Sequence, residues 1–348
     1  MRAAVYREKG SVRVEELAAP ELDAGEILVR VDACGVCGTD VKKIQKGLLA
    51  GPRIFGHEIA GTVARTASGV TRFREGDRVA LHHHIPCGTC FYCRQAAYAQ
   101  CPRYKENGTT AGFEPSGGGF AEYVKARDYI VERGAIAIPD GVLPEEAAFV
   151  EPVNTCLKAV QKARIERGQT VLVVGQGPIG LLLMQLAKRA GATVIASDTM
   201  PDRLAMSRTL GSDAALDATA VDVVREVRSA TSGRGADRTL LAALGPIAVQ
   251  QAIDATRAAG HVVIFSATSP GETAEIDLGT LSASEKDILT SYSASVDVQD
   301  EAARVVFTRE IRVREIVTHR LPLDRAPEAV ELASHPAPGV LKVVIEMK

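Results

Sequence analysis

The segment VLVVGQGPIG, residues 171–180, decides the fold. Four apolar residues typical of a buried strand lead directly into a glycine-rich turn, and a helical stretch follows. Gly175 would permit the tight turn, Gly177 would let the backbone approach a pyrophosphate, and Gly180 would let the helix pack closely on the strand. The start of that helix would present free N–H groups to phosphate. The segment therefore predicts a dinucleotide-binding turn.

The next predicted strand, residues 193–198, ends in Asp198, 18 residues after Gly180. That spacing is typical of the acid that accepts hydrogen bonds from ribose hydroxyls, although a helix-cap or turn aspartate is the alternative. A carboxylate there should repel a 2′-phosphate, which favours NAD over NADP, whereas Arg203 could accommodate that phosphate. The residues expected to bind the cofactor are Gly175, Gly177, Pro178, Ile179, Gly180, Asp198 and Arg203.

Strands and helices alternate through the middle of the chain, as parallel βαβ units require. The predicted strands are 171–174, 193–198, 238–242 and 261–267, with predicted helices that include 221–230 and 248–259. The first 150 residues instead consist of short strands punctuated by Gly, Pro and Asp, which predicts an irregular, barrel-like β domain. From about residue 291 the alternation loosens, and a last strand at 340–347 suggests that the tail returns to the first domain.

Composition limits the function classes. The chain has 348 residues, with Lys+Arg 41 against Asp+Glu 43 and a formal charge of −2. This balance lacks the basic footprint of a nucleic-acid binder. No signal-peptide h-region or membrane-length apolar run is visible, so a cytoplasmic protein is expected. In that reducing setting, seven cysteines favour metal or thiol chemistry over disulfides.

Four of these cysteines form the pattern C-x2-C-x2-C-x7-C. Thiolates at such spacing can converge on one ion, and four sulfurs complete a tetrahedral zinc shell with no open position. A closed shell cannot bind substrate, so this zinc is expected to be structural. A redox CxxC is the weaker alternative, because no thioredoxin-like βαβ pattern surrounds the motif. The expected ligands are Cys87, Cys90, Cys93 and Cys101.

Three consecutive histidines, His82, His83 and His84, precede the cysteine motif. On an extended strand, successive side chains point to opposite faces, so the three could not all reach one ion. We expect them to be solvated or packed, without metal.

A catalytic zinc needs about three protein ligands and an open position. The candidates are Cys37, the pair His57-Glu58, and Glu151, which lie far apart in the sequence. Each has an ordinary alternative as a buried thiol, a loop histidine or a surface acid, and only their combination indicates a site. Cys34 and Cys156 have apolar neighbours and are expected to be buried thiols.

Four blocks resemble the zinc-containing medium-chain alcohol/polyol dehydrogenase family. They are CGVCGTD, GHEIAGTVARTASGVTRFREGDRV, the four-cysteine lobe, and VLVVGQGPIG with the later Asp198. The resemblance implies a GroES-like catalytic domain at 1–150 and 291–348, carrying a zinc lobe at about 84–105. It also implies a Rossmann domain, a doubly wound parallel sheet, at 151–290, with the active site in the cleft between the domains.

The resemblance also assigns roles. Cys37, His57 and Glu151 would hold a catalytic zinc, and Glu151 in place of a cysteine resembles the sorbitol and threonine dehydrogenase branch. Glu58 would be an exchangeable ligand or a partner of the site, and Thr39 would accept the substrate proton. Two positions depart from the family pattern: Lys42 replaces a relay histidine, and Gly38 replaces a basic residue that contacts pyrophosphate.

The implied activity is zinc-dependent transfer of hydride from a secondary alcohol, such as a polyol, sugar alcohol or cyclitol, to NAD. The expected cofactors are two Zn²⁺ ions per chain and NAD, and the expected partner is a small-molecule substrate. A homodimer or homotetramer is expected by family analogy, without binding to nucleic acid or to a membrane. The alternatives are a dehydrogenase of an aminocyclitol, amino-sugar or threonine-like amino-alcohol, and a zinc- and NAD-binding protein without catalysis.

Overall fold

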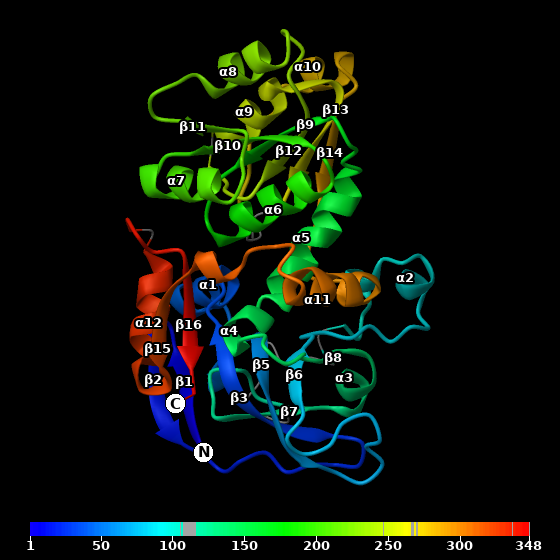
Figure 1. Ribbon diagram of the computed structural model, residues 1–348, viewed down its shortest axis with the longest axis vertical. Helices are drawn as coiled ribbons and strands as arrows, with labels where there is room; N and C mark the ends of the chain where they lie inside the picture. The colour runs from blue at the N-terminus through cyan, green and yellow to red at the C-terminus, as the bar shows by residue number, and fades with distance from the viewer. Residues whose placement is uncertain are drawn as a thin grey trace. The chain divides into compact units, whose positions relative to one another are not determined.

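The protein is described from a computed structural model that covers residues 1–104, 106, 116–245, 247–265, 268, 271–335 and 337–347. The chain divides into two compact units, Met1–Asn154 with Ala294–Lys348, and Thr155–Ser293 (Figure 1). The first unit is therefore discontinuous in sequence. Within the described residues, no helix combines the length and apolar character needed to cross a membrane.

The second unit contains a six-stranded sheet in the order β11-β10-β9-β12-β13-β14, and every pair in it is parallel. Counted within the unit, this order is 3-2-1-4-5-6, the arrangement of a Rossmann sheet. The predicted doubly wound parallel sheet is thus confirmed. Its strands are β9 Thr170–Val174, β10 Thr193–Asp198, β11 Ala214–Asp217, β12 Ala236–Leu241, β13 Thr256–Ile264 and β14 Asp287–Thr290.

Helices cover both faces of this sheet, with α6 and α7 on one side and α8 and α9 on the other (Figure 1). The helix predicted at 248–259 ends at Ala255, because the backbone becomes extended at Thr256 and enters β13. The predicted strand 261–267 ends at Ile264 in the structure, and its last two residues lie outside the described part of the chain. The helices are α6 Pro178–Arg189, α7 Pro201–Thr209, α8 Val223–Ala230, α9 Ala248–Ala255 and α10 Leu278–Ala283.

The first unit is built on a seven-stranded mixed sheet with the path β15-β16-β3-β5-β6-β8, on which β7 pairs with β3. A second sheet has the order β2-β1-β4. The strands are β1 Arg2–Glu8, β2 Ser11–Glu16, β3 Ile27–Gly35, β4 Arg53–Ile54, β5 Glu58–Thr66, β6 Arg78–Leu81, β7 Tyr123–Ala126, β8 Ala135–Ala137, β15 Val317–Pro322 and β16 Lys342–Glu346.

Short helices join these strands, in agreement with the β-rich texture of the first 150 residues. They are α1 Gly38–Lys46, α2 Phe91–Arg94, α3 Asp128–Arg133, α4 Pro144–Ala147, α11 Gln299–Phe307 and α12 Ala326–Ser334, with single 3₁₀ turns at Tyr98–Gln100, Val296–Val298, Arg314–Ile316 and Leu323–Arg325. Helix α5, Val150–Ala163, begins in the first unit and continues into the second.

The register of the large sheet brings residues that are distant in the sequence to the same end of the sheet. Gly35 at the end of β3 pairs with Glu58 at the start of β5, and Leu81 at the end of β6 pairs with Ile59. The last strand, β16, pairs Val344 with Gly35 on the other side of β3. The loops that follow β3, precede β5 and follow β6 therefore meet at that end of the sheet.

We predict that Gly180→Ala destabilises the second unit by roughly 1–3 kcal/mol, the usual cost of overpacking. A Cβ at this position would lie 1.7 Å from the carbonyl oxygen of Gly175, so α6 would have to move away from the turn. Urea denaturation measures the change. Gly245→Ala is the matched control, because its Cβ would meet nothing within 4 Å. Equal stability of the two variants would contradict the predicted close contact.

Candidate active site

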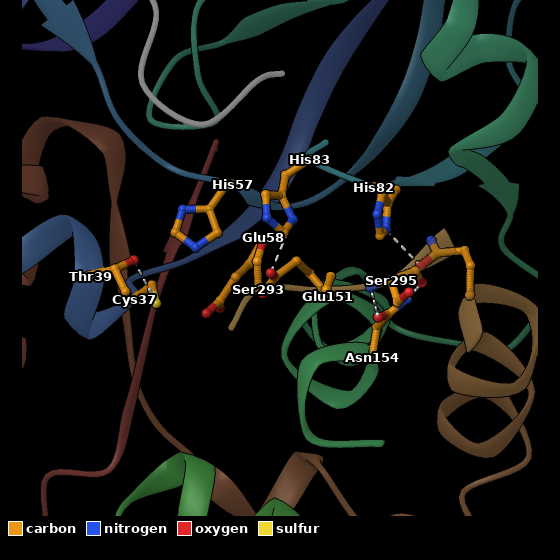
Figure 2. Close-up of polar contacts among 12 residues, drawn as sticks. Cys37, Thr39, His57, Glu58, His82, His83, Glu151, Asn154, Ser293 and Ser295 are labelled. Atoms are coloured by element: carbon orange, nitrogen blue, oxygen red, sulfur yellow. Dashed lines mark hydrogen bonds and ion pairs between the residues drawn. The ribbon is translucent and has the colours of Figure 1, made fainter. Parts of the chain in front are cut away.

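Three potential metal ligands lie together at this end of the large sheet. Cys37 lies at the start of α1, His57 immediately before β5, and Glu58 is the first residue of β5. One ligand atom from each residue lies within 4.8 Å of the other two (Figure 2). The hydroxyl of Thr39 donates to Cys37 Sγ at 3.2 Å. A thiol, an imidazole and a carboxylate are ligand types that zinc accepts.

The imidazole of His57 is held by a carboxylate that the sequence analysis did not assign. His57 Nδ1 lies 3.2 Å from Oδ1 of Asp40, which is fully buried. Because a carboxylate only accepts, Nδ1–H donates and Nε2 is left for a metal, as is usual for metal-binding histidines. Burial lowers the pKa of His57, but the charges of Asp40 and Cys37 outweigh it and hold the pKa well above its usual value.

The carboxylate of Glu58 is paired with a buried lysine from near the end of the sequence. Lys342 Nζ donates to Glu58 Oε1 at 2.6 Å and to the carbonyl oxygen of Val36 at 3.1 Å. It also forms an ion pair with Glu58 Oε2. Burial lowers the pKa of Lys342, but the negative charge of Glu58 outweighs it and raises that pKa overall. The pair gives this carboxylate, which is only 1% exposed, a partner in the protein interior.

Glu151 is buried in the first turn of α5, with 6% exposure. It is not a member of the close group formed by Cys37, His57 and Glu58. Instead, Oε1 of Glu151 lies 3.0 Å from Nδ1 of His83 (Figure 2). Burial raises the pKa of Glu151 to about 7, a shift typical of a carboxylate without a full complement of partners.

The three consecutive histidines are all buried and follow β6 rather than continuing it. His82 Nδ1 lies 2.8 Å from Gln299 Oε1, which also accepts from the Asn154 amide at 2.6 Å. Burial lowers the pKa of His82 to about 4. Among the described residues, none of the three belongs to a potential metal group.

The cysteine lobe contains four free thiols that converge on one point. The Sγ atoms of Cys90 and Cys93 are 3.5 Å apart, and the backbone N–H of Cys87 donates to Cys101 Sγ at 3.4 Å. Hydrogen bonds from Thr89 lower the pKa of Cys87 to about 6, which favours a thiolate at neutral pH. Four sulfurs at these positions fit a tetrahedral zinc ion. Residue 105, the last of the predicted lobe, lies outside the described residues.

The glycine turn has the local geometry that a pyrophosphate requires. Gly175 has φ +87, and Gly177 precedes α6, whose first residue is Pro178. Asp198 ends β10, and its two carboxylate oxygens accept from the backbone N–H groups of Gln176 at 2.5 Å and Met200 at 2.9 Å. These bonds fix the carboxylate beside the turn.

Arg203 reaches the same turn from α7. A Cβ placed on Gly177 would lie 3.7 Å from its guanidinium Nη1. The turn is therefore flanked by a fixed carboxylate and a cation, whose contacts with a cofactor stay predictions. The cation is close enough to meet a phosphate that approaches Gly177.

Comparison with known proteins gives two family matches and similarity over nearly the whole chain. Residues 23–140 match the alcohol dehydrogenase GroES-like domain, and residues 178–308 match the zinc-binding dehydrogenase family. Sorbitol dehydrogenase from Bacillus subtilis is 29% identical, covering 99% of this chain and 97% of the relative. L-threonine 3-dehydrogenase from Pyrococcus abyssi is 31% identical, covering 96% of this chain and 94% of the relative.

A solved structure is similar in both sequence and fold. It is a putative zinc-binding dehydrogenase from Sinorhizobium meliloti bound to NADP, with a TM-score of 0.90 and 32% identity. The match covers 99% of this chain and 98% of that one.

We predict that Asp40→Asn weakens zinc binding at the Cys37–His57 site by roughly 10–100-fold at alkaline pH, since the imidazole loses its orienting carboxylate. Zinc requires neutral His57, so binding should strengthen as pH rises through the raised pKa of that residue. Without the Asp40 charge, His57 deprotonates at lower pH, and the midpoint of this dependence should move downward. Competition with a chelating dye across the pH range measures both effects; identical profiles for the two proteins would refute the assignment.

For the lobe, Cys101→Ser should lower zinc content by about one ion per chain and lower the melting temperature, because three sulfurs no longer close the shell. Elemental analysis and thermal denaturation measure the two effects. Cys156→Ser is the control, since Cys156 is equally buried but outside both metal groups. Unchanged zinc content in Cys101→Ser would exclude a structural zinc at this lobe.

Proposed function

Because this chain belongs to the zinc-containing medium-chain alcohol and polyol dehydrogenase family, we propose that it oxidises a secondary alcohol of the polyol class to a ketone with NAD. The observation that carries the proposal is the group formed by half-buried Cys37 and buried His57 and Glu58, with the buried Glu151 carboxylate nearby. A thiol, an imidazole and carboxylates form the donor set of a catalytic zinc site.

We assign Cys37, His57 and Glu151 as the zinc ligands, with Glu58 as an exchangeable carboxylate beside them. Zinc bound there would supply Lewis-acid activation of the substrate oxygen. The protein supplies the orientation of the ligands. Asp40 directs Nε2 of His57 toward the site, and Lys342 neutralises Glu58 so that it need not bind the ion. The burial of these groups keeps bulk water away from the reacting carbon.

Thr39 is placed to receive the substrate proton. Its hydroxyl is bonded to Cys37 Sγ, so it lies beside the first ligand. A hydroxyl can accept a proton on one side while donating its own on the other, which makes Thr39 the start of a relay. Lys42, on the next turn of α1, occupies the position of the relay histidine found in other members. The later part of the proton path is therefore proposed to differ in this protein.

The cofactor proposed is NAD. The expected contacts come from the turn Gly175–Gly180, with Asp198 accepting from the adenosine ribose. Asp198 is fixed by Gln176 and Met200, so its negative charge is held where a 2′-phosphate would lie. Arg203 beside Gly177 supports pyrophosphate binding and could partly offset this repulsion.

Carboxylates in place of a second thiolate give an oxygen-rich site, which suits a substrate with two neighbouring oxygens. We propose a vicinal diol or polyol, whose second hydroxyl could also bind the ion. The second candidate is a threonine-like amino-alcohol, favoured by the similarity to L-threonine 3-dehydrogenase. An amino group would need a carboxylate partner, whereas a second hydroxyl would not.

The chain is further proposed to act in the cytoplasm as a homodimer or homotetramer, with residues 1–150 and 291–348 as the catalytic domain and 151–290 as the cofactor domain. Seven free cysteines support a reducing compartment. Exposed apolar side chains at Ile247 and Leu278 are compatible with self-association.

A panel of alcohols tested with NAD and with NADP checks the proposal. Vicinal diols and polyols should give kcat/KM values at least roughly tenfold above monohydric alcohols, and NAD should be preferred over NADP. Threonine and amino-alcohols form the second arm, and Glu151→Ala should lose activity toward every substrate. Efficient turnover of ethanol alone would refute the polyol assignment.

A further inference from the structure

His83 contacts the proposed site, although we expected it to be solvated or packed without a role there. Its Nδ1 atom lies 3.0 Å from Glu151 Oε1, and both side chains are buried, with 4% and 6% exposure. Its ring centroid is 5.3 Å from that of His57. His83 therefore touches two of the residues proposed to hold zinc, while standing outside the potential metal group itself.

The ring of His83 is fixed by its neighbours. Its centroid lies 5.4 Å from that of His82 and 4.4 Å from that of His84, which in turn lies 4.7 Å from the ring of Tyr104. Tyr104 is 1% exposed, and its hydroxyl donates to the carbonyl oxygen of Ala294 at 2.9 Å. A buried ring packed between other rings has little freedom to rotate, so Nδ1 is held in one direction.

Glu151, in contrast, has a long side chain that must be ordered before it can serve as a ligand. It projects from the first turn of α5, and its carboxylate lies beside His83 Nδ1. The two atoms lie at hydrogen-bonding distance but are not aligned for a hydrogen bond in this conformation. A shift of the Glu151 side chain would let a neutral imidazole donate from Nδ1 and leave the second carboxylate oxygen available. Partners of this kind orient ligands and are worth about 10–100-fold in metal affinity.

We propose that His83 is a positioning residue that holds the carboxylate of Glu151 toward the zinc bound by Cys37 and His57. The inference rests on the proposed function, because it requires Glu151 to be a ligand. It goes beyond that function by giving one member of the three-histidine segment a specific task. His82 has a different partner, Gln299, and His84 packs on Tyr104, so the task belongs to His83 alone among the three.

The test measures metal binding rather than turnover. Cobalt is titrated into the metal-depleted full-length protein, because visible absorption separates a one-thiolate site from the four-thiolate lobe. His83→Ala should weaken cobalt binding at the one-thiolate site by roughly 10–100-fold. His83→Asn should recover most of the affinity, since its amide can donate from nearly the same place as Nδ1. Cys156→Ser, a buried substitution outside both metal groups, is the control and should leave the affinity unchanged.

A double mutant separates positioning from other roles. If His83 acts through Glu151, His83→Ala should add no further loss in a Glu151→Ala background. Additive losses, or full cobalt affinity in His83→Ala, would overturn the inference while leaving the proposed function intact. Full affinity in Glu151→Ala alone would instead overturn the ligand set of the proposed function. Circular dichroism of each variant checks that it folds, and His83→Asn keeps the test decisive if His83→Ala does not.

Discussion

The buried ion pair between Glu58 and Lys342 is the interaction on which the first unit depends. A carboxylate removed from water requires a partner, and here that partner comes from the last strand, β16. The pair therefore links the return of the C-terminal tail to the chemistry of the site. Lys342 also binds the carbonyl oxygen of Val36, just before Cys37. The ammonium group of Lys342 thus contacts both the backbone just before Cys37 and the carboxylate of Glu58.

Each of the other polar groups of the site has a polar partner of its own. Asp40 fixes His57, Thr39 bonds to Cys37, and His83 meets Glu151. Thr39 and Asp40 lie on α1 and His83 follows β6, so the antiparallel register of β3, β5 and β6 brings them to the same end of the sheet, whereas Glu151 comes from α5. The site is consequently rigid because strand pairing and buried polar contacts specify the same arrangement.

The sequence predicts the fold well where local pattern and packing agree. The βαβ alternation and the glycine turn suffice for the parallel sheet, because that turn is a local structure with strict backbone requirements. Cys37, His57 and Glu58 are likewise found near one another, and the four cysteines converge. Their roles as zinc ligands, and that of Glu151, stay predictions.

The supporting residues were harder to find from sequence. Lys342 is 284 residues from Glu58, and nothing in its neighbourhood indicates a buried cation. Asp40 lies only three residues after Cys37, and its place in a short helix was the available clue. The three histidines follow β6 instead of extending it, so strand alternation does not separate them, and their successive ring centroids lie 5.4 and 4.4 Å apart. Nor could the sequence place His83 against Glu151, since that contact depends on where α5 packs.

A crystal structure of the zinc-loaded protein with a vicinal diol, recorded at the zinc absorption edge, would locate both metal ions and identify their ligands. We expect anomalous density between Cys37 Sγ, His57 Nε2 and the Glu151 carboxylate, with a diol oxygen completing the shell. A second peak should lie among the four lobe cysteines. Zinc bound only at the lobe, or held by Cys37, His57 and Glu58 with Glu151 uninvolved, would refute the proposed ligand set.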